Sequence, residues 1–458
     1  MNPTRMPVPA LPAACKRRRY LPALASAVAA AAMLAACGGR DDDAGFSGAV
    51  YAGTNRAGGN TIAAFGRNAD GTLTPIAEYA TGGLGASLDG TNDGLDPLIS
   101  EDAIVVVDKR YLLAVNPGSN SIASLRINAD FSLTLIGTAS TGGVGPNSIA
   151  YRNGLVVVAN ADSDGVSTGA ANQRGNLTAL RLDTSTGTLT PIANSTRELG
   201  NRPSDIEFSP DGAHLIVSSW NSGSTLLAAG SDAELVVYGV QADGAPTAAP
   251  QASVTSTPRG NAVGRNLPAA IGFATVSVGT RTFVIASEAR EFLSSGAPAM
   301  LPMFQTASVS TWELNANGTL TARSLDVLTG PSITTGTAAP TSACWIVVSP
   351  DRSTFWVAHA SGGVISSFRL NADGTASLIN SRAAIGAPAV VGATPLATAD
   401  GLVDLAVSGD GRYLYNLLGL KGSVAVYGIG ASGALSPVQK TSGLLPTIGL
   451  VGLVSVDR

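Results

Sequence analysis

The sequence is poor in charged residues, histidine and cysteine. Only 13% of the 458 residues are charged, and there are two histidines and three cysteines. So few charges argue against long solvent-exposed helices, and three cysteines cannot form a disulfide framework. A zinc site built from Cys and His is not expected either. The 28 Lys and Arg residues are outnumbered by 32 Asp and Glu. This balance lacks the basic excess of nucleic-acid-binding proteins, so we expect no nucleic-acid partner.

The first 36 residues have the organisation of an export signal. A run of Lys and Arg at 16–19 precedes an uncharged, alanine-rich stretch that is too short to span a bilayer comfortably. The stretch ends in Leu34-Ala35-Ala36-Cys37, which resembles the bacterial lipobox, where cleavage leaves the cysteine as the acylated first residue. The alternative is a chance cysteine after an ordinary cleavage site.

We therefore expect a signal peptide over 1–36, a flexible tether over 37–47 that begins at lipidated Cys37, and a folded domain over 48–458. The resemblance implies a location in the cell envelope, with membrane contact through the lipid anchor only. Gly38 stands after the cysteine where an Asp would favour retention in the inner membrane. The expected location is therefore the outer membrane, facing the periplasm or the cell surface.

A short segment recurs along the chain, in which an aromatic residue is followed six positions later by Gly. The five clear copies are Phe65 with Gly71, Tyr238 with Gly244, Trp312 with Gly318, Phe368 with Gly374, and Tyr427 with Gly433. Two degraded copies cover 125–133 and 180–189. Each copy predicts a strand, a tight turn of the Asp-Gly or Asn-Gly type, and a second strand, because the Gly supplies the positive φ that such a turn needs.

A second hairpin precedes each copy, as in Ser209-Pro210-Asp211-Gly212 between two apolar runs. Each repeat is then a unit of four strands, a to d, about 60 residues long. Four-stranded units in radial repetition predict an all-β fold, a seven-bladed β-propeller. The chain starts at strand b of the first unit and ends in an unassigned apolar strand at 448–456. We expect that last strand to complete the first blade and so to close the ring.

Several of these segments resemble the bacterial lactonase-like propellers, relatives of cytosolic 6-phosphogluconolactonase and of carboxymuconate-lactonising enzymes. The segments that carry the resemblance are 51–55 (Tyr-Ala-Gly-Thr-Asn), 70–76, 209–212, 342–351 and 410–415. The resemblance extends over nearly all of 48–458 and implies the propeller fold and a lactonase, a carboxylic ester hydrolase. The family's Gly-Pro-Arg-His stretch is replaced here by Gly200-Asn201-Arg202-Pro203, which keeps the Arg and lacks the His.

The connections between strands b and c and between strands d and a are long, and the topology places them on one rim of the ring, where binding sites usually lie. The residues expected to end the seven b strands, and to face the channel mouth at this rim, are Asn55, Asn116, Asn160, Trp220, Glu288, His359 and Leu418. Asn55, Asn116, Asn160 and Trp220 are the candidate ligand-binding residues. The alternative is that the Asn residues only terminate strands.

Lactone hydrolysis needs a group that activates water and a cation that stabilises an oxyanion. Glu288 or His359 is the candidate base, and Arg202 or Arg290 is the candidate anchor for the oxyanion or a carboxylate. On this hypothesis Glu288→Gln and His359→Ala each abolish turnover. The alternative is a salt-bridged polar rim without chemistry. His214 follows a short turn on the opposite rim and is expected to be an ordinary surface residue.

Two function hypotheses follow. One is an envelope-anchored hydrolase that opens a small sugar or organic-acid lactone at the channel mouth. The other is a non-enzymatic propeller whose long loops bind a peptide, a glycan or an envelope protein. No cofactor and no metal site are expected, with a Ca²⁺ ion above a ring of Asn carbonyls as a weak alternative. Cys344 lies in an apolar strand rather than beside a base. We expect a monomer.

Overall fold

The structure is a computed structural model that describes residues 45–86, 97–162, 174–219, 234–256, 270–290, 306–330, 342–360, 362–386, 400–447 and 449–458. The expected signal peptide, Cys37, Trp220 and most of the long connections lie outside these residues. Ser47, expected in the tether, already pairs with the domain, because its backbone N–H donates to the Arg67 carbonyl at 2.8 Å. Within the described ranges, no helix has the length and apolar character needed to span a membrane.

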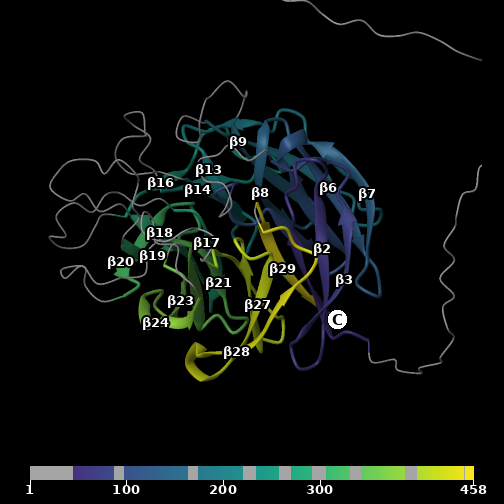
Figure 1. The fold of residues 1–458 in the computed structure, drawn as a ribbon. Helices are drawn as coiled ribbons and strands as arrows, with labels where there is room; N and C mark the ends of the chain where they lie inside the picture. The colour runs from purple at the N-terminus through teal and green to yellow at the C-terminus, as the bar shows by residue number, and fades with distance from the viewer. Residues whose placement is uncertain are drawn as a thin grey trace, which may run out of the picture. The chain divides into compact units, whose positions relative to one another are not determined.

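The described chain forms seven antiparallel sheets in a ring, which confirms the predicted seven-bladed β-propeller (Figure 1). The strands are given blade by blade, from innermost strand a to outermost strand d. Blade 1 contains β29 (Val451–Asp457), β1 (Gly48–Gly53), β2 (Thr61–Arg67) and β3 (Leu73–Ala80); blade 2 contains β4 (Ile104–Val107), β5 (Tyr111–Asn116), β6 (Ser121–Ile127) and β7 (Leu133–Ser140); blade 3 contains β8 (Val144–Arg152), β9 (Leu155–Asp162), β10 (Asn176–Leu182) and β11 (Leu189–Pro191), with β12 (Arg197–Glu198) also paired to β10.

The remaining blades follow the same order. Blade 4 contains β13 (Pro203–Phe208), β14 (His214–Ser219), β15 (Leu235–Gly239) and β16 (Ala252–Val254); blade 5 contains β17 (Phe273–Val278), β18 (Arg281–Arg290), β19 (Thr306–Leu314) and β20 (Leu320–Leu328); blade 6 contains β21 (Ala343–Val348), β22 (Thr354–His359), β23 (Val364–Leu370) and β24 (Ala376–Ile385); blade 7 contains β25 (Leu402–Val407), β26 (Tyr413–Leu418), β27 (Ser423–Ile429) and β28 (Leu435–Ser442). Two short 3₁₀ helices are η1 (Pro117–Ser119) and η6 (Ala431–Gly433).

Two physical constraints require glycine in the turn of the recurring segment. At Gly71 and Gly374 the backbone has φ of 85° and 86°, as predicted for the turn between strands c and d. In addition, an aromatic ring at the start of strand b of the preceding blade packs against that turn. A Cβ on Gly71 would lie 2.1 Å from the Tyr413 ring, and a Cβ on Gly374 would lie 2.2 Å from the Phe283 ring. Any larger residue would therefore separate neighbouring blades.

The C-terminal strand closes the ring as predicted. β29 pairs antiparallel with β1, with Val454 opposite Tyr51 and Val451 opposite Gly53. In Figure 1 the yellow C-terminal strand lies beside the purple strands of blade 1. The closure therefore joins the two ends of the described domain in one sheet and leaves no open edge between first and last blade.

Arg67 reinforces this closure from the third strand of blade 1. Its guanidinium lies 2.9 Å from the Asp457 carboxylate of β29 and 3.3 Å from the Asp410 carboxylate of the a–b turn in blade 7. The Arg67 side chain is only 4% exposed. The guanidinium also stacks over the Tyr413 ring, with its carbon 6.0 Å from the ring centroid. One side chain thus connects blade 1, the closing strand and blade 7.

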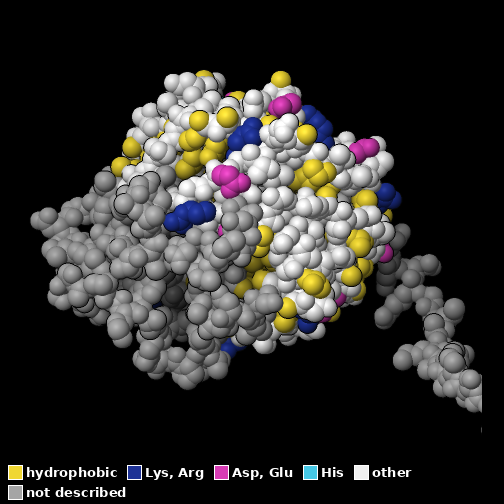
Figure 2. Space-filling view, turned by 90° about the horizontal axis from the view of Figure 1, so that it is seen from above, with side chains coloured by type: hydrophobic (Ala, Val, Ile, Leu, Met, Phe, Trp, Pro, Cys, Tyr) yellow, Lys and Arg dark blue, Asp and Glu magenta, His cyan; other side chains and the backbone are white. Residues whose placement is uncertain are grey.

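The described surface carries few and scattered charges. On the face seen in Figure 2, basic side chains lie singly among acidic and apolar ones, and the visible described residues form no continuous basic patch. Exposed large hydrophobic side chains are found mainly on outermost strands, as at Leu135, Leu378 and Val438.

Removing the closing cation should destabilise the ring. We expect Arg67→Met to lower the free energy of unfolding by about 2–4 kcal/mol, because two carboxylates lose their partner. Arg56→Met is the matched control, since Arg56 forms an exposed pair with Glu78, 41% and 30% exposed, for which a loss of about 1 kcal/mol or less is expected. Urea denaturation measures both. Equal losses in the two variants would show that Arg67 has no special part in closure.

Candidate functional site

The predicted site residues at the ends of the b strands do not face the channel. Strand a alone lines the channel, and strand b is the next strand outward, so the side chains at its end lie between blades. Asn116 is fully buried and accepts hydrogen bonds from Asn60 Nδ2 at 3.0 Å and from Thr81 Oγ1 at 2.6 Å, both in blade 1. The expectation that these residues converge at the channel mouth is therefore wrong for the described ones.

The other two asparagines also have structural partners. Asn160 Nδ2 donates to the Thr141 carbonyl and to Asn176 Oδ1, at 2.9 and 2.8 Å. Asn55, two residues after the end of β1, adopts a φ of 50°, and its Oδ1 accepts the backbone N–H of Ala86 at 2.8 Å. These contacts agree with the alternative that the asparagines terminate strands and bond their surroundings. A part in ligand binding is not tested and stays a prediction.

Glu288 and His359 lie in separate buried environments. Glu288 accepts hydrogen bonds from Ser308 Oγ of its own blade and from Ser256 Oγ of blade 4, the latter at 2.6 Å. His359 Nε2 lies 2.8 Å from Ser366 Oγ within blade 6. Burial lowers the pKa of His359 to about 3, so the imidazole is neutral and a weak base at physiological pH. Their predicted catalytic roles stay predictions, and the geometry gives them structural partners.

Of the remaining residues discussed in the sequence analysis, the structure describes some and not others. Arg290 ends β18, and its side chain, like all of Trp220, lies outside what the structure describes. His214 was expected at the surface, but it is 4% exposed, with Nδ1 2.9 Å from Gln251 Oε1. That expectation is wrong, since the side chain is buried and contacts Gln251, the residue that precedes outer strand β16. Cys344 is buried in β21 and forms no disulfide with a described residue, as expected from its apolar strand.

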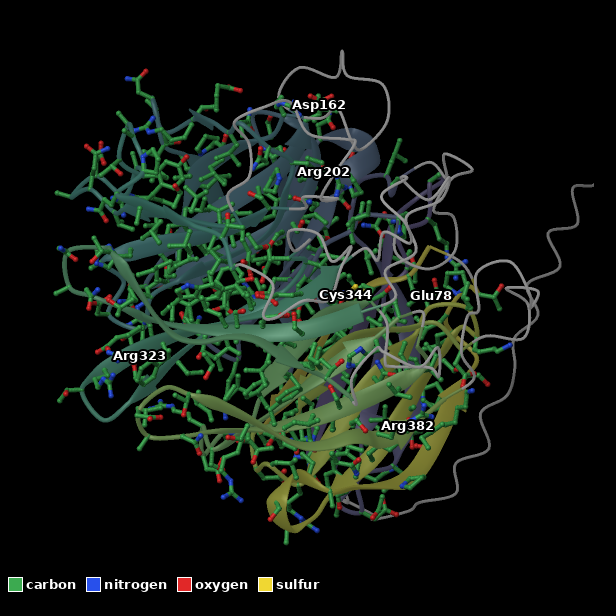
Figure 3. The ribbon with its side chains drawn as sticks, turned by 90° about the vertical axis from the view of Figure 1, so that its left-hand side faces the viewer. Glu78, Asp162, Arg202, Arg323, Cys344 and Arg382 are labelled. Atoms are coloured by element: carbon green, nitrogen blue, oxygen red, sulfur yellow. The ribbon has the colours of Figure 1, made fainter. Side chains whose placement is uncertain are left out.

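Arg202 holds a segment that crosses the ring at the rim where the d–a connections lie. This segment, residues 97–102, is called the strap. Arg202 is buried, and its guanidinium donates to the backbone carbonyls of Leu98 and Ile99, at 2.5 and 3.4 Å. In Figure 3, Arg202 and Cys344 lie near the centre of the view, and Arg323 lies toward its left-hand edge. Arg202 therefore connects the start of blade 4 to the start of blade 2.

The far side of the strap is fixed to blade 6. Trp345 Nε1 donates to the Ser100 carbonyl at 3.0 Å, and the backbone N–H of Ile346 donates to Glu101 Oε1 at 3.0 Å. The carboxyl of Glu101 lies so close to blade 5 that a Cβ on Gly272 would be 1.7 Å from Oε2. Among the described residues, the strap thus covers the channel at the d–a rim.

A cavity of about 410 Å³ lies in the channel beneath the strap. It has carboxyl groups at its strap end and mostly apolar strand residues below them. The lining residues are Glu101, Asp102, Ile104, Val106, Glu207, Phe273, Ala274, Thr275, Val276, Ile346, Val347, Val348, Asp404, Leu405, Ala406, Val407, Leu453, Val454 and Ser455. A smaller cavity of about 220 Å³ adjoins it, with Asp102 and Glu207 lining both. This volume is within the range of small-molecule sites.

The carboxyl groups around the cavity have raised pKa values. Burial, together with the charges of neighbouring acids, raises the pKa of Glu101 and of Asp102 well above its ordinary range. Burial raises the pKa of Asp205 to about 7, and burial with the nearby Asp205 charge raises that of Glu207 to about 8. Asp404 adds a further negative charge to this group. Carboxyl groups of this kind can exchange protons near neutral pH.

Backbone hydrogen bonding explains the positions of two of these acids, Asp205 and Glu207. The inner strand of each blade has an edge that is not paired within its own sheet, so its N–H groups need other acceptors. Asp205 Oδ2 accepts the Phe273 N–H at 3.2 Å, and Glu207 Oε2 accepts the Thr275 N–H at 2.6 Å. Asp102 differs, because no described residue donates a hydrogen bond to its carboxylate. Its carboxylate therefore remains able to accept a bond from a ligand.

No group of three or more His, Cys, Asp or Glu side chains in the described part of the chain is arranged to hold a metal ion. This observation does not concern amide oxygens, so the ring of Asn carbonyls considered as a Ca²⁺ site stays a prediction.

The sequence carries a signal for the cavity acids. Asp205 and Glu207 stand at alternate positions of inner strand β13, and Asp404 is a single acid in the apolar run Val403-Asp404-Leu405. An acid in such a strand indicates a polar channel or a backbone acceptor. Which strand is innermost decides this placement, and the prediction from sequence put the site at the ends of strand b instead.

The raised pKa of Glu207 predicts a pH dependence of stability. The folded protein keeps a proton on Glu207 up to about pH 8, while the unfolded chain releases it near its ordinary value of 4.5. The stabilising contribution is therefore complete below about pH 4.5 and is lost as pH rises to about 8. Since Gln cannot ionise, we expect wild type to lose more stability than Glu207→Gln between pH 5 and pH 8.

Urea denaturation at several pH values tests this difference, with Glu78→Gln on an outer strand as the control. His359, with its lowered pKa, changes stability in the opposite direction between about pH 3 and 6.5, but it is present in all three proteins and its effect cancels. Parallel pH curves for wild type and Glu207→Gln would contradict the prediction.

Comparison with known proteins relates this ring to a family. Residues 59–195 match the family model described as "Lactonase, 7-bladed beta-propeller". A search of the curated proteins finds no match.

Solved structures resemble the chain over most of its length. A protein from Lactobacillus plantarum matches with a TM-score of 0.59 and 16% identity, covering 90% of this chain and 99% of that one. A hypothetical selenium-binding protein from Sulfolobus tokodaii matches with a TM-score of 0.56 and 13% identity, covering 89% and 93%. The periplasmic gluconolactonase of Pseudomonas aeruginosa matches with a TM-score of 0.51 and 19% identity, covering 74% and 84%.

At these identities the solved structures support the fold alone. The family match over residues 59–195, taken with the seven four-stranded blades and the C-terminal strand that closes them, shows that the chain is a seven-bladed β-propeller similar to the lactonase family.

Proposed function

We propose that the protein hydrolyses a small lactone in the central cavity. The observation that carries this proposal is the 410 Å³ cavity in which Asp102 and Glu207 lie together, both with raised pKa values. The family match and the likeness to a protein described as a periplasmic gluconolactonase support lactone hydrolysis as the reaction class.

The two carboxyl groups can divide the proton transfers of lactone opening. Because the charge of each disfavours ionisation of the other, the pair holds one proton near neutral pH. The protonated carboxyl group of the pair is the proton donor, and the ionised one is the acceptor. The ionised group takes a proton from water as the hydroxide oxygen adds to the lactone carbonyl carbon.

The tetrahedral intermediate then collapses. The bond between the former carbonyl carbon and the ring oxygen breaks, and the protonated carboxyl group gives its proton to that oxygen. One water has been added, the product is a hydroxy acid, and the proton now lies on the carboxyl group that acted as base. Transfer of this proton between Asp102 and Glu207, which line the same two cavities, restores the starting state.

We place the entrance to the cavity at the rim of the a–b turns. The strap covers the opposite rim through its bonds to Arg202 and Trp345. Toward the a–b turns, the lining residues Val348, Val407 and Ser455 are only partly buried. The lactone would therefore reach Glu207 along the apolar part of the channel.

We also propose where the protein is located in the cell. The resemblance of residues 34–37 to a lipobox supports an envelope protein anchored through Cys37, in the outer membrane. A lactone outside the cytoplasm would then be the substrate.

The proposal predicts that isosteric removal of either carboxyl group abolishes most activity. We expect Glu207→Gln and Asp102→Asn each to reduce kcat by about 10²–10⁴-fold, the usual contribution of a general acid or base. Gln at 207 can still accept the Thr275 N–H, so the fold should persist, as circular dichroism would verify. Base consumption at constant pH measures hydrolysis of a panel of lactones.

Two further variants, Glu288→Gln and Glu78→Gln, are measured in the same assay for comparison. Glu78 lies on the outer strand β3 and serves as a surface control. If Glu288→Gln abolishes turnover while Glu207→Gln does not, catalysis belongs to the b-strand residues predicted from sequence and the cavity proposal fails. Absence of hydrolysis by wild type across the panel would contradict the proposed activity altogether.

A further inference from the structure

We infer that the cavity selects an uncharged, polyhydroxylated lactone and rejects its phosphorylated counterpart. This inference rests on the proposed function and concerns the substrate class of the same site. It follows from the charge of the cavity lining, the hydrogen-bonding capacity of the acids, and the position of the nearest basic residue.

Every titratable residue that lines the larger cavity is acidic. These residues are Glu101, Asp102, Glu207 and Asp404, and the lining includes no Lys, Arg or His from the described chain. Asp205 lies beside them and adds to their mutual repulsion. A phosphate monoester brings about −1.5 to −2 charges at neutral pH. Burying that charge where no described Lys, Arg or His of the lining can pair with it is strongly unfavourable, and every ionised acid of the lining adds repulsion.

An uncharged sugar lactone suits the same lining. Its hydroxyl groups are donors, and carboxylate oxygens are acceptors with several lone-pair sites. Asp102 is the clearest case, since no described residue donates to its carboxylate. Glu207 uses Oε2 for the backbone N–H and hydroxyl of Thr275, which leaves Oε1 toward other donors. Below the acids, Phe273, Val276 and Ile346 can contact the faces of the ring.

The nearest basic residue of the described lining lies in the smaller cavity. Arg152 ends strand β8, and a Cβ on Gly212 of the neighbouring a–b turn would lie 3.2 Å from its Nε. The Arg152 guanidinium therefore packs against that turn, at the end of the channel away from Glu101 and Asp404. A phosphate could reach it only where the smaller cavity ends, which makes Arg152 the residue to examine if phosphorylated substrates are accepted.

The same charge favours departure of the product. Hydrolysis converts an uncharged lactone into a hydroxy acid that is ionised at neutral pH. The new carboxylate is then repelled by the acids that accepted hydrogen bonds from the substrate. We therefore expect weak inhibition by the product acid.

The test compares glucono-δ-lactone with its 6-phosphate, using purified full-length protein and base consumption at pH 7. We expect kcat/KM to be at least about 100-fold higher for the uncharged lactone, a ratio that corresponds to about 2.7 kcal/mol. Asp404→Asn should narrow the ratio about tenfold by accelerating the phosphorylated lactone, because it removes one repulsive charge. Glu101→Gln, which can still accept the Ile346 N–H, should act in the same direction if Asp404→Asn does not fold.

The outcomes separate the inference from the proposed function. Hydrolysis of neither compound, nor of the wider lactone panel, overturns the proposed function. Equal rates, or preference for the phosphorylated lactone, overturn the inference while the function stands. Loss of that preference in Arg152→Met would then identify the smaller cavity as a phosphate site.

Discussion

The unpaired edge of the innermost strands determines much of the chemistry of this ring. Each strand a pairs with strand b on one side, and on its other side faces the channel and the neighbouring blade. Its free N–H and C=O groups must be satisfied there. Backbone contacts supply some partners, as between Gly272 N–H and the Cys344 carbonyl at 2.8 Å. Side chains supply others, among them Asp205, Glu207 and Ser455, whose hydroxyl donates to the Val407 carbonyl at 2.7 Å.

This requirement gathers acids in a desolvated space, and their raised pKa values follow. Asp205 and Glu207 act first as acceptors for Phe273 and Thr275. Once placed, they disfavour ionisation of Asp102, which has no such backbone partner. A structural need of the fold thus creates a group of carboxyls that exchange protons near neutral pH. The strap adds Glu101 to this group and covers one end of the channel. Its backbone is left-handed at Ile99 and Asp102, where φ is 50° and 58°.

The fold was predictable from sequence because its signals are local. The Asp-Gly turns, alternating strands and unassigned last strand each reflect the geometry of a few neighbouring residues, and β29 pairs with β1 as expected. The copy without Gly kept the turn as well, since Phe131 adopts a φ of 64°. The site was less predictable, because facing the channel depends on how strands are ordered around it. Glu288 ends strand b and bonds Ser256 of the preceding blade, a contact that no local pattern reveals.

The most direct test of the account is a crystal structure with a non-hydrolysable lactam analogue of an uncharged sugar lactone. We expect the analogue in the central cavity, with the Asp102 and Glu207 carboxyl groups within hydrogen-bonding distance of its ring amide or hydroxyl groups. An analogue bound instead at the outer ends of the b strands, in contact with Glu288 or His359, would contradict it.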